Sequence, residues 1–200
     1  MKIISSKGRR FSSFILSPIV RLFCYLKVPP NVISLMGFTI AVVSIYFIAN
    51  GRFIIGGLLI FLGGIFDLID GEVSRRRGIT SRFGAFFDSF IDRYSDNLIY
   101  LGFLYYFSTK GEIIYIILCG AIIIGSMLVS YARARAEGLG IECKVGFFER
   151  TERLLTIVAG TIIGGVGFGI AIKIALWLVA IGSHLTAIHR LIYVWIKSKD

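Results

Sequence analysis

Two runs of sequence decide the fold: Asp67-Leu68-Ile69-Asp70-Gly71-Glu72-Val73-Ser74-Arg75 and, eight residues later, Gly84-Ala85-Phe86-Phe87-Asp88-Ser89-Phe90-Ile91-Asp92. Each run stands at the end of a strongly apolar segment. Helical geometry places Asp67 and Asp70 on one face of a first helix, and it places Asp88 and Asp92 on one face of the next. A charged side chain near a hydrocarbon layer costs roughly 2.5–3.5 kcal/mol. Four carboxylates on one short turn therefore need a counter-charge, for which a hard divalent cation is the natural candidate.

Residue types alone leave two other interpretations of these carboxylates open. They could form a proton or ion relay in a transporter, because ionisable groups inside a membrane are functional by default. They could also simply pair with the arginines nearby.

The composition indicates an all-α integral membrane protein with a single domain over residues 1–200. The chain is 56% hydrophobic and has only three prolines. Irregular backbone facing lipid would leave polar groups unsatisfied, so apolar runs of about 17–25 residues are predicted to be transmembrane helices. Six such spans are predicted, as a bundle over residues 31–197: 32–49, 53–69, 83–107, 113–132, 154–169 and 170–195. Span 53–69 is rich in glycine, which we expect to let helices approach closely.

An amphipathic juxtamembrane helix is predicted before the bundle, within residues 1–28. Apolar residues recur at three- and four-residue steps over 9–27, with polar residues between them. Arg9 and Arg10 precede this pattern, which is typical of a helix lying along the cytoplasmic interface. Pro18 is predicted to kink or split the helix, and Asn31 is a candidate N-cap for the first span.

The basic residues predict the orientation. Excess Lys and Arg mark the cytoplasmic side of a membrane protein, so we expect a multi-pass protein of the cell membrane with both termini and the aspartates cytoplasmic. The opposite side has only Arg52, Lys110 and Lys173 in its short loops. The basic residues of the predicted cytoplasmic side are Lys2, Lys7, Arg9, Arg10, Arg21, Lys27, Arg75, Arg76, Arg77, Arg82, Arg133, Arg135, Lys144, Arg150, Arg153, Arg190, Lys197 and Lys199.

The net charge of +10 does not indicate a nucleic-acid partner. The basic residues flank membrane helices, no nucleic-acid motif is present, and attraction to an anionic lipid surface of the bilayer accounts for them.

The spacing of the two runs resembles the signature of the CDP-alcohol phosphatidyltransferases, D-x-x-D-G-x-x-A-R-x8-G-x3-D-x3-D. The chain departs from it at one position, where Ser74 replaces the usual Ala, a change between small residues. Pro30, Asn31 and Ser34 also resemble the family's Pro-Asn-x-x-Ser/Thr pattern before the first span.

The resemblance implies a reaction in which a CDP-linked lipid, CDP-diacylglycerol or CDP-archaeol, gives its phosphatidyl group to an alcohol and releases CMP. By this resemblance Asp67, Asp70 and Asp88 ligate two Mg²⁺ or Mn²⁺ ions per active site, and Asp92 lies close to the second ion. Asp92 is then the implied general base that takes the proton of the acceptor hydroxyl. The residues implied to bind CDP are Asn31, Asp67, Asp70, Gly71, Ser74, Arg75 and Gly84. Asp96, one turn beyond Asp92, is given no catalytic role and is expected to pair with Arg93 or Tyr94.

A phosphorylated acceptor is predicted from the arginines, because guanidinium groups bind phosphate well. The run 130–137 and the run 149–153 are similar to the branch of the family that uses inositol 1-phosphate, the phosphatidylinositol-phosphate and archaetidylinositol-phosphate synthases. The residues predicted to bind the acceptor phosphate are Ser130, Arg133, Arg135, Arg153 and Arg190.

Three alternatives remain. Within the family, the acceptor could instead be glycerol 3-phosphate, whose phosphate needs the same arginines. An ion-coupled transporter would use the aspartates, but no internal repeat typical of such proteins is seen. A purely structural membrane protein leaves the carboxylates unexplained. The family commonly forms homodimers, and small residues such as Gly120 and Gly125 could support one.

Overall fold

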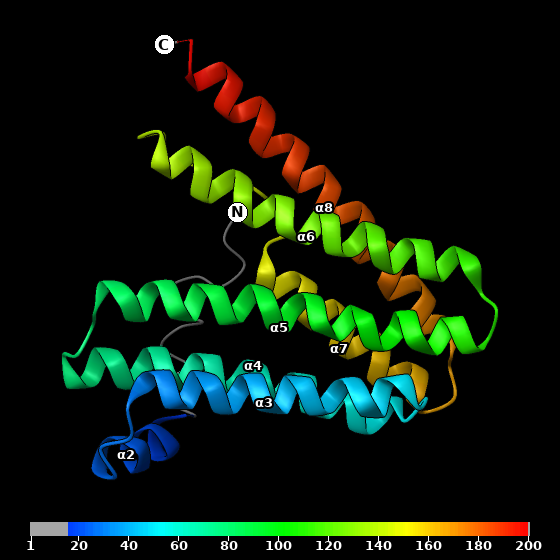
Figure 1. Ribbon diagram of the computed structural model, residues 1–200, viewed down its shortest axis with the longest axis horizontal. Helices are drawn as coiled ribbons and strands as arrows, with labels where there is room; N and C mark the ends of the chain where they lie inside the picture. Colours follow the sequence, from blue (N-terminus) through cyan, green and yellow to red (C-terminus); the bar gives the residue numbers. More distant parts are fainter. Residues whose placement is uncertain (1–15, 200) are drawn as a thin grey trace.

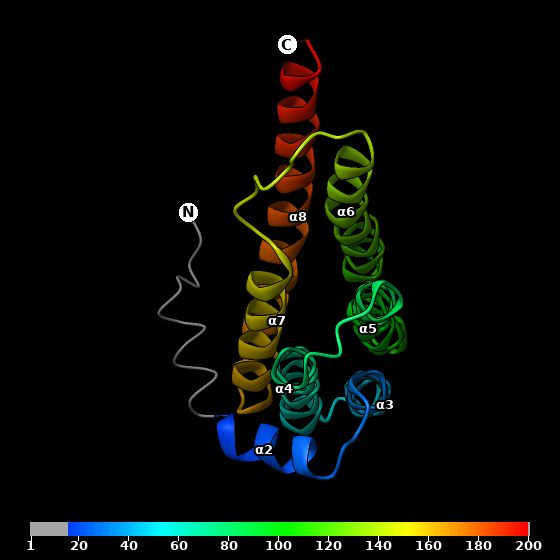
Figure 2. The ribbon, with the colours of Figure 1, turned by 90° about the vertical axis from the view of Figure 1, so that its left-hand side faces the viewer.

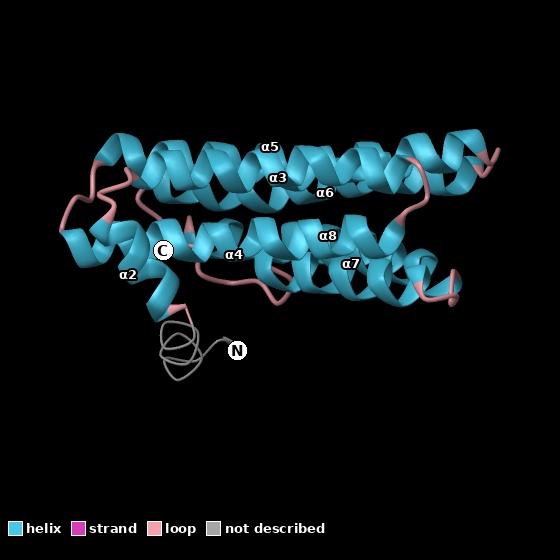
Figure 3. Ribbon diagram, turned by 90° about the horizontal axis from the view of Figure 1, so that it is seen from below, coloured by secondary structure: helices cyan, strands magenta, loops and turns pink. Residues whose placement is uncertain are grey.

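The computed structural model describes residues 16–199, and this part of the chain is built from seven α-helices joined by short loops, with no strand (Figures 1 and 3). The helices are α2 (Ser17–Tyr25), α3 (Pro30–Ala49), α4 (Phe53–Arg77), α5 (Arg82–Thr109), α6 (Ile113–Gly138), α7 (Arg150–Gly165) and α8 (Ile170–Lys197).

The six longer helices form a closed ring. The principal contacts join α3 to α4, α4 to α7, α7 to α8, α8 to α6, α6 to α5 and α5 back to α3. Figure 2 shows α3, α4 and α5 nearly end-on and α6, α7 and α8 obliquely, with α2 at the bottom of the view, against α4. Inside the ring a continuous core is centred on Phe103 and Phe107 of α5, Ile122 of α6 and Leu176 of α8, all at most 2% exposed. The outward faces carry many exposed large apolar side chains, as expected of helices that face lipid.

Four helices are long and apolar enough to cross a membrane: α3, α4, α6 and α8. The prediction of six spans is therefore confirmed for four helices only. The middle of α5 carries Asp92, Arg93 and Asp96, which lower its apolar character, and α7 has only 16 residues.

The predicted limits of several helices differ from those observed. Helix α7 begins at Arg150, earlier than the predicted span 154–169, because Glu149 and Glu152 form a capping box ahead of the apolar run. It ends at Gly165, before Gly167, whose φ of 123° is incompatible with a helix.

Pro18, predicted to kink or split the interfacial helix, lies in the first turn of α2. The amide that a proline lacks has no partner within the helix at that position, so Pro18 is well suited to begin α2. The rest of the predicted interfacial helix, residues 9–15, lies outside the described residues. The prediction that Asn31 caps the first span is wrong, since α3 begins at Pro30 with Pro29 as its N-cap.

Glycines bring α3 and α4 together just before the aspartates, as the sequence predicted. A Cβ on Gly37 would lie 2.9 Å from the Cβ of Phe66, and a Cβ on Gly63 would lie 3.3 Å from the carbonyl oxygen of Gly37. Only residues without a side chain allow this approach, which also places Gly37 beside Asp67.

Candidate active site

The tight turn between α4 and α5 brings the two aspartate runs, residues 67–75 and 84–92, to the same end of the ring of helices. Helix α4 ends at Gly78, whose left-handed φ of 62° lets the Ile79 amide donate to the Ser74 carbonyl at 3.2 Å. Helix α5 then begins with Ser81 as its N-cap, whose Oγ accepts from the Gly84 amide at 2.9 Å. The C-terminal part of α4 and the first turns of α5 therefore lie at the same end of the ring, where both helices pack against α3.

A pocket of about 290 Å³ opens at this end, between the starts of α3 and α5 and the C-terminal part of α4. It has a polar lining that includes Asp88 and Ser34. Of the residues predicted to bind CDP, all but Asp67 line it: Asn31, Asp70, Gly71, Ser74, Arg75 and Gly84.

Two glycines keep this pocket open. A Cβ on Gly84 would lie 3.0 Å from the Ser81 Oγ and 3.6 Å from the Asn31 Oδ1, and a Cβ on Gly71 would lie 3.3 Å from the Arg75 Nη1. Arg75 itself is 66% exposed and pairs with Glu72 at 3.0 Å. Its guanidinium is therefore close to the backbone of Gly71 but free enough to reach a bound phosphate.

Asp70 is held by a residue to which the sequence assigned no role. It is 4% exposed, and its Oδ2 accepts a hydrogen bond of 2.5 Å from the Ser34 hydroxyl on α3. The only sequence signal for this contact is the position of Ser34 in the Pro-Asn-x-x-Ser pattern. The bond joins the first helix of the ring to the aspartate run.

Arg150, also unassigned from the sequence, lies among the other carboxylates. Its Nη2 is 2.5 Å from Asp67 Oδ2, its Nη1 is 3.0 Å from Asp92 Oδ2, and its Nε is 3.1 Å from Asp96 Oδ1. The three aspartates are only 11–17% exposed, so the single positive charge of the guanidinium is shared among three carboxylates in a partly dry setting.

The expected pairing of Asp96 with Arg93 or Tyr94 is wrong. Asp96 pairs with Arg150 and, at 3.4 Å, with Arg153. Arg93 instead donates to the Ser89 carbonyl of its own helix at 2.6 Å. Arg153 is 3% exposed and its Nη1 is buried without a hydrogen-bond partner.

The carboxylates fit a hard divalent cation by their chemistry. All four predicted ligands are oxygen donors, and Asp92 Oδ1 is buried without a hydrogen-bond partner, so it has a lone pair available. Within residues 16–199, however, no three Asp, Glu, His or Cys side chains are already gathered around one point as metal ligands. The present arrangement is that of carboxylates spread around a guanidinium.

The residues predicted to bind an acceptor phosphate lie in two places. Arg135 and Arg190 line a groove of about 340 Å³ between α6 and α8, and Ser130 is half-buried on α6. Arg133 pairs with Glu137 on its own helix at 2.9 Å, and Arg153 lies against Asp96.

The guanidinium of Arg190 is engaged by α6 and by the loop that precedes α7. It is 2% exposed and donates to the carbonyls of Val145 and Val129 at 2.8 and 2.6 Å. Its third contact is an ion pair with Glu149 at 2.9 Å. Arg190 thereby fixes the residue that caps α7, immediately before Arg150.

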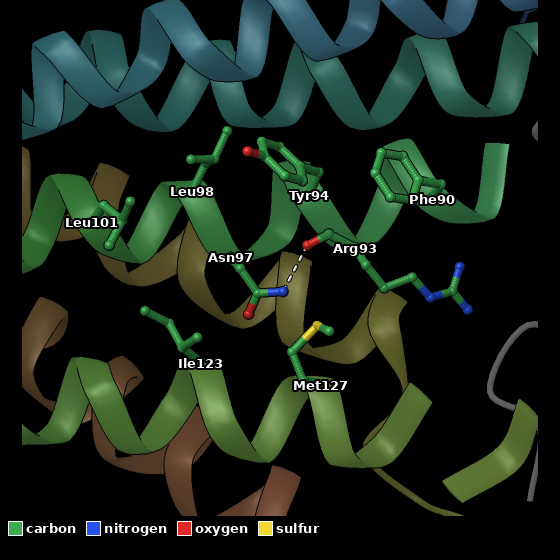
Figure 4. A pocket seen from close by; sticks show the side chains of 8 residues that line it. All are labelled: Phe90, Arg93, Tyr94, Asn97, Leu98, Leu101, Ile123 and Met127. Carbon is green, nitrogen blue, oxygen red and sulfur yellow. Dashed lines mark hydrogen bonds between the residues drawn. The ribbon is translucent and has the colours of Figure 1, made fainter. Parts of the chain in front are cut away.

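A larger hollow, of about 490 Å³, lies on the side of the ring between α5 and α6 (Figure 4). Apolar side chains such as Leu98, Leu101 and Ile123 line it, and the Asn97 amide donates to the Arg93 carbonyl within it. It contains none of the predicted site residues. Its lining is almost entirely apolar, unlike that of the pocket at the end of the ring.

The fold and the site together define a multi-pass membrane protein whose polar centre lies at one end of its helices. The chain belongs to the CDP-alcohol phosphatidyltransferase family, which it matches over residues 27–196. It is therefore an enzyme, a membrane transferase of phospholipid biosynthesis, and the resemblance predicted from the aspartate runs is confirmed.

Named relatives support this assignment along nearly the whole chain. An archaetidylinositol phosphate synthase of Methanothermobacter thermautotrophicus is 36% identical over 91% of this chain and 93% of its own length. A phosphatidylinositol phosphate synthase of Streptomyces avermitilis is 35% identical over 99% of this chain and 85% of its own length.

Solved structures of a phosphatidylinositol phosphate synthase of Mycobacterium tuberculosis have the same fold. The structure with CDP-DAG bound has a TM-score of 0.83 and 30% identity, covering 90% of this chain and 94% of that one. A second structure of that protein, in complex with manganese and citrate, also has a TM-score of 0.83 and 30% identity, covering 89% and 88%.

Proposed function

We propose that the protein transfers the phosphatidyl or archaetidyl group of a CDP-linked lipid to inositol 1-phosphate and releases CMP. The observation that carries this proposal is the pocket at the end of the ring. Six residues predicted to bind CDP line it together with Asp88. The names of the relatives, and the CDP-DAG bound to the Mycobacterium tuberculosis protein, support the same substrates.

The donor's CDP group occupies the polar pocket in this proposal. Arg75, which is largely exposed, binds a phosphate, and Gly71 and Gly84 leave room for the nucleotide beside the backbone. The lipid chains of CDP-diacylglycerol or CDP-archaeol then extend from the pocket along the apolar outer faces of the helices into the bilayer. The residues proposed to bind CDP are Asn31, Asp67, Asp70, Gly71, Ser74, Arg75 and Gly84.

Asp67, Asp70, Asp88 and Asp92 are proposed to hold two Mg²⁺ or Mn²⁺ ions. When bound, the ions neutralise the diphosphate charge of the donor. The manganese in the structure of the Mycobacterium tuberculosis protein supports the proposal that the present chain also binds a divalent cation.

Asp92 is proposed as the general base. Its Oδ1 is buried without a hydrogen-bond partner, so it can accept the proton of the acceptor hydroxyl. The hydroxyl oxygen then bonds to the phosphorus of the phosphatidyl group, and the bond from that phosphorus to the CMP oxygen breaks.

The phosphate of the acceptor is proposed to bind to the arginines predicted from the sequence, of which one lies against an aspartate. Arg153, which is buried and has one unpartnered Nη1, is the member of the predicted set nearest to them by its contact with Asp96. The full proposed set is Ser130, Arg133, Arg135, Arg153 and Arg190.

The membrane arrangement is also part of the proposal. All six helices from α3 to α8 span the membrane as one domain, α2 lies along the cytoplasmic interface, and the site and both termini are cytoplasmic, as the distribution of basic residues favours.

A homodimer is proposed too. Gly125 is occupied by contacts with Ser183 and His184 within the chain, whereas Gly120 has open space around it.

Acceptor choice tests the proposal. Purified protein is given a CDP-lipid and Mn²⁺, with inositol 1-phosphate or glycerol 3-phosphate in parallel, and CMP is measured. Release with inositol 1-phosphate alone supports the proposal. Release with glycerol 3-phosphate alone would show that glycerol 3-phosphate is the acceptor instead. Absence of CMP with both acceptors would contradict a phosphorylated acceptor and would favour a free alcohol as the substrate of this family member.

A further inference from the structure

The guanidinium group of Arg150 contacts three carboxylates, which come from α4 and α5. Each nitrogen of Arg150 contacts a different aspartate: Nη2 contacts Asp67, Nη1 contacts Asp92, and Nε contacts Asp96. Arg150 is 30% exposed at its side chain and the aspartates less. These contacts are therefore better shielded from water than a surface ion pair.

The position of Arg150 is fixed by its backbone. It is the first residue of α7, directly after the capping box of Glu149 and Glu152. Glu149 is in turn paired with the buried Arg190 of α8. The guanidinium therefore reaches the aspartates from a rigid helix start and not from a flexible loop.

Arg150 and a divalent cation compete for the same carboxylates. Asp67 and Asp92 belong to the proposed metal ligands, and their Oδ2 atoms contact Arg150 at 2.5 and 3.0 Å. A cation bound to those carboxylates at about 2.0–2.1 Å would repel a guanidinium held against them. Asp96 lies outside the proposed ligand set and can keep its contact with Arg150 Nε throughout.

We propose, on the basis of the function proposed above, that Arg150 is the resident counter-ion of the aspartate cluster. Without a divalent cation it holds Asp67 and Asp92 in place and offsets part of their negative charge. When a cation binds, Arg150 gives up both carboxylates and stays on Asp96. The metal-free protein is thereby stabilised, and the apparent affinity for the metal is lowered by the exchange.

Direct metal binding without substrates tests this exchange. Full-length wild type, Arg150→Gln and the control Arg76→Gln are compared by titration with Mn²⁺ and by thermal unfolding in EDTA and in Mn²⁺. Arg76 is a matched control because it also pairs with a carboxylate at this end of the ring, Glu72 at 2.9 Å, which is not a proposed ligand.

We expect Arg150→Gln to bind Mn²⁺ more tightly by roughly five- to a hundredfold, the usual range of coupling between two binding events. It should also melt earlier than wild type in EDTA and gain more from Mn²⁺, while Arg76→Gln binds Mn²⁺ as wild type does. Unchanged or weaker Mn²⁺ binding by Arg150→Gln would overturn the exchange.

A second variant covers the case in which Arg150→Gln does not fold. Lysine keeps the charge but lacks the three-nitrogen fork, so Arg150→Lys should bind Mn²⁺ more tightly than wild type; equal or weaker binding contradicts the exchange. Mn²⁺ binding by neither wild type nor either variant would instead overturn the proposed metal site itself.

Discussion

The Ser34 hydroxyl donates a hydrogen bond of 2.5 Å to Asp70 Oδ2 and so fixes the aspartate run of α4 against the start of α3. Both side chains are buried, at 3% and 4% exposed. A buried carboxylate is costly unless it is hydrogen-bonded or paired. The side chain of Asp70 should therefore depend on Ser34 for its position in the pocket.

Ser34→Ala is expected to destabilise the protein and loosen Asp70. Loss of a hydrogen bond to a charged group costs about 1.5–3 kcal/mol, so the melting temperature should fall and the affinity for a CDP-lipid should weaken. Ser44→Ala is the control, since Ser44 is buried on the same helix but donates only to the Ala41 carbonyl. Equal effects of the two variants on CDP-lipid affinity would contradict the role of Ser34.

Gly37→Ala is expected to separate α3 from α4. Its Cβ would lie 2.9 Å from the Cβ of Phe66, which cannot move without its helix. Such overpacking costs about 1–3 kcal/mol, measurable as a lower melting temperature. Gly138→Ala is the matched control because Gly138 is also helical and the added carbon would meet no neighbouring helix or side chain within 4 Å. A melting temperature of Gly37→Ala as high as that of Gly138→Ala would show that the crossing tolerates a side chain.

Arg190→Gln is expected to release the loop before α7. The carbonyls of Val145 and Val129 would lose their donor, and each unsatisfied group costs about 1–3 kcal/mol if it stays buried. Faster proteolysis within residues 139–149 and a lower melting temperature should follow. Arg135→Gln, in the same groove but exposed, should leave both unchanged. Cleavage at the wild-type rate in Arg190→Gln would refute the anchoring role.

Hydropathy predicted where the helices lie better than where they end. The predicted span 53–69 stops at the charged residues, whereas α4 continues to Arg77. Charged residues leave the apolar pattern but not the helix, since the Gly78 turn is what ends α4. The limits of α7 were missed for the related reason that its capping box is polar.

The residues lining the pocket could be predicted because they follow one another at fixed spacing in α4 and α5. Contacts between distant parts of the chain could not. Arg150 lies 83 residues after Asp67 in sequence, and nothing in its local pattern distinguishes it from the other arginines at this end. Its role follows only from the packing of α7 against α4.

The most direct test of the central claim, that the aspartate cluster performs the transfer, is a measurement on Asp92→Asn. CDP-lipid binding and CMP release are measured with inositol 1-phosphate and Mn²⁺, with Glu72→Gln as a control carboxylate that pairs only with Arg75 and Arg76. The account predicts that Asp92→Asn binds the CDP-lipid but releases CMP about 10²–10⁴-fold more slowly, as expected for loss of a general base. Release of CMP by Asp92→Asn at the rate of Glu72→Gln would contradict it.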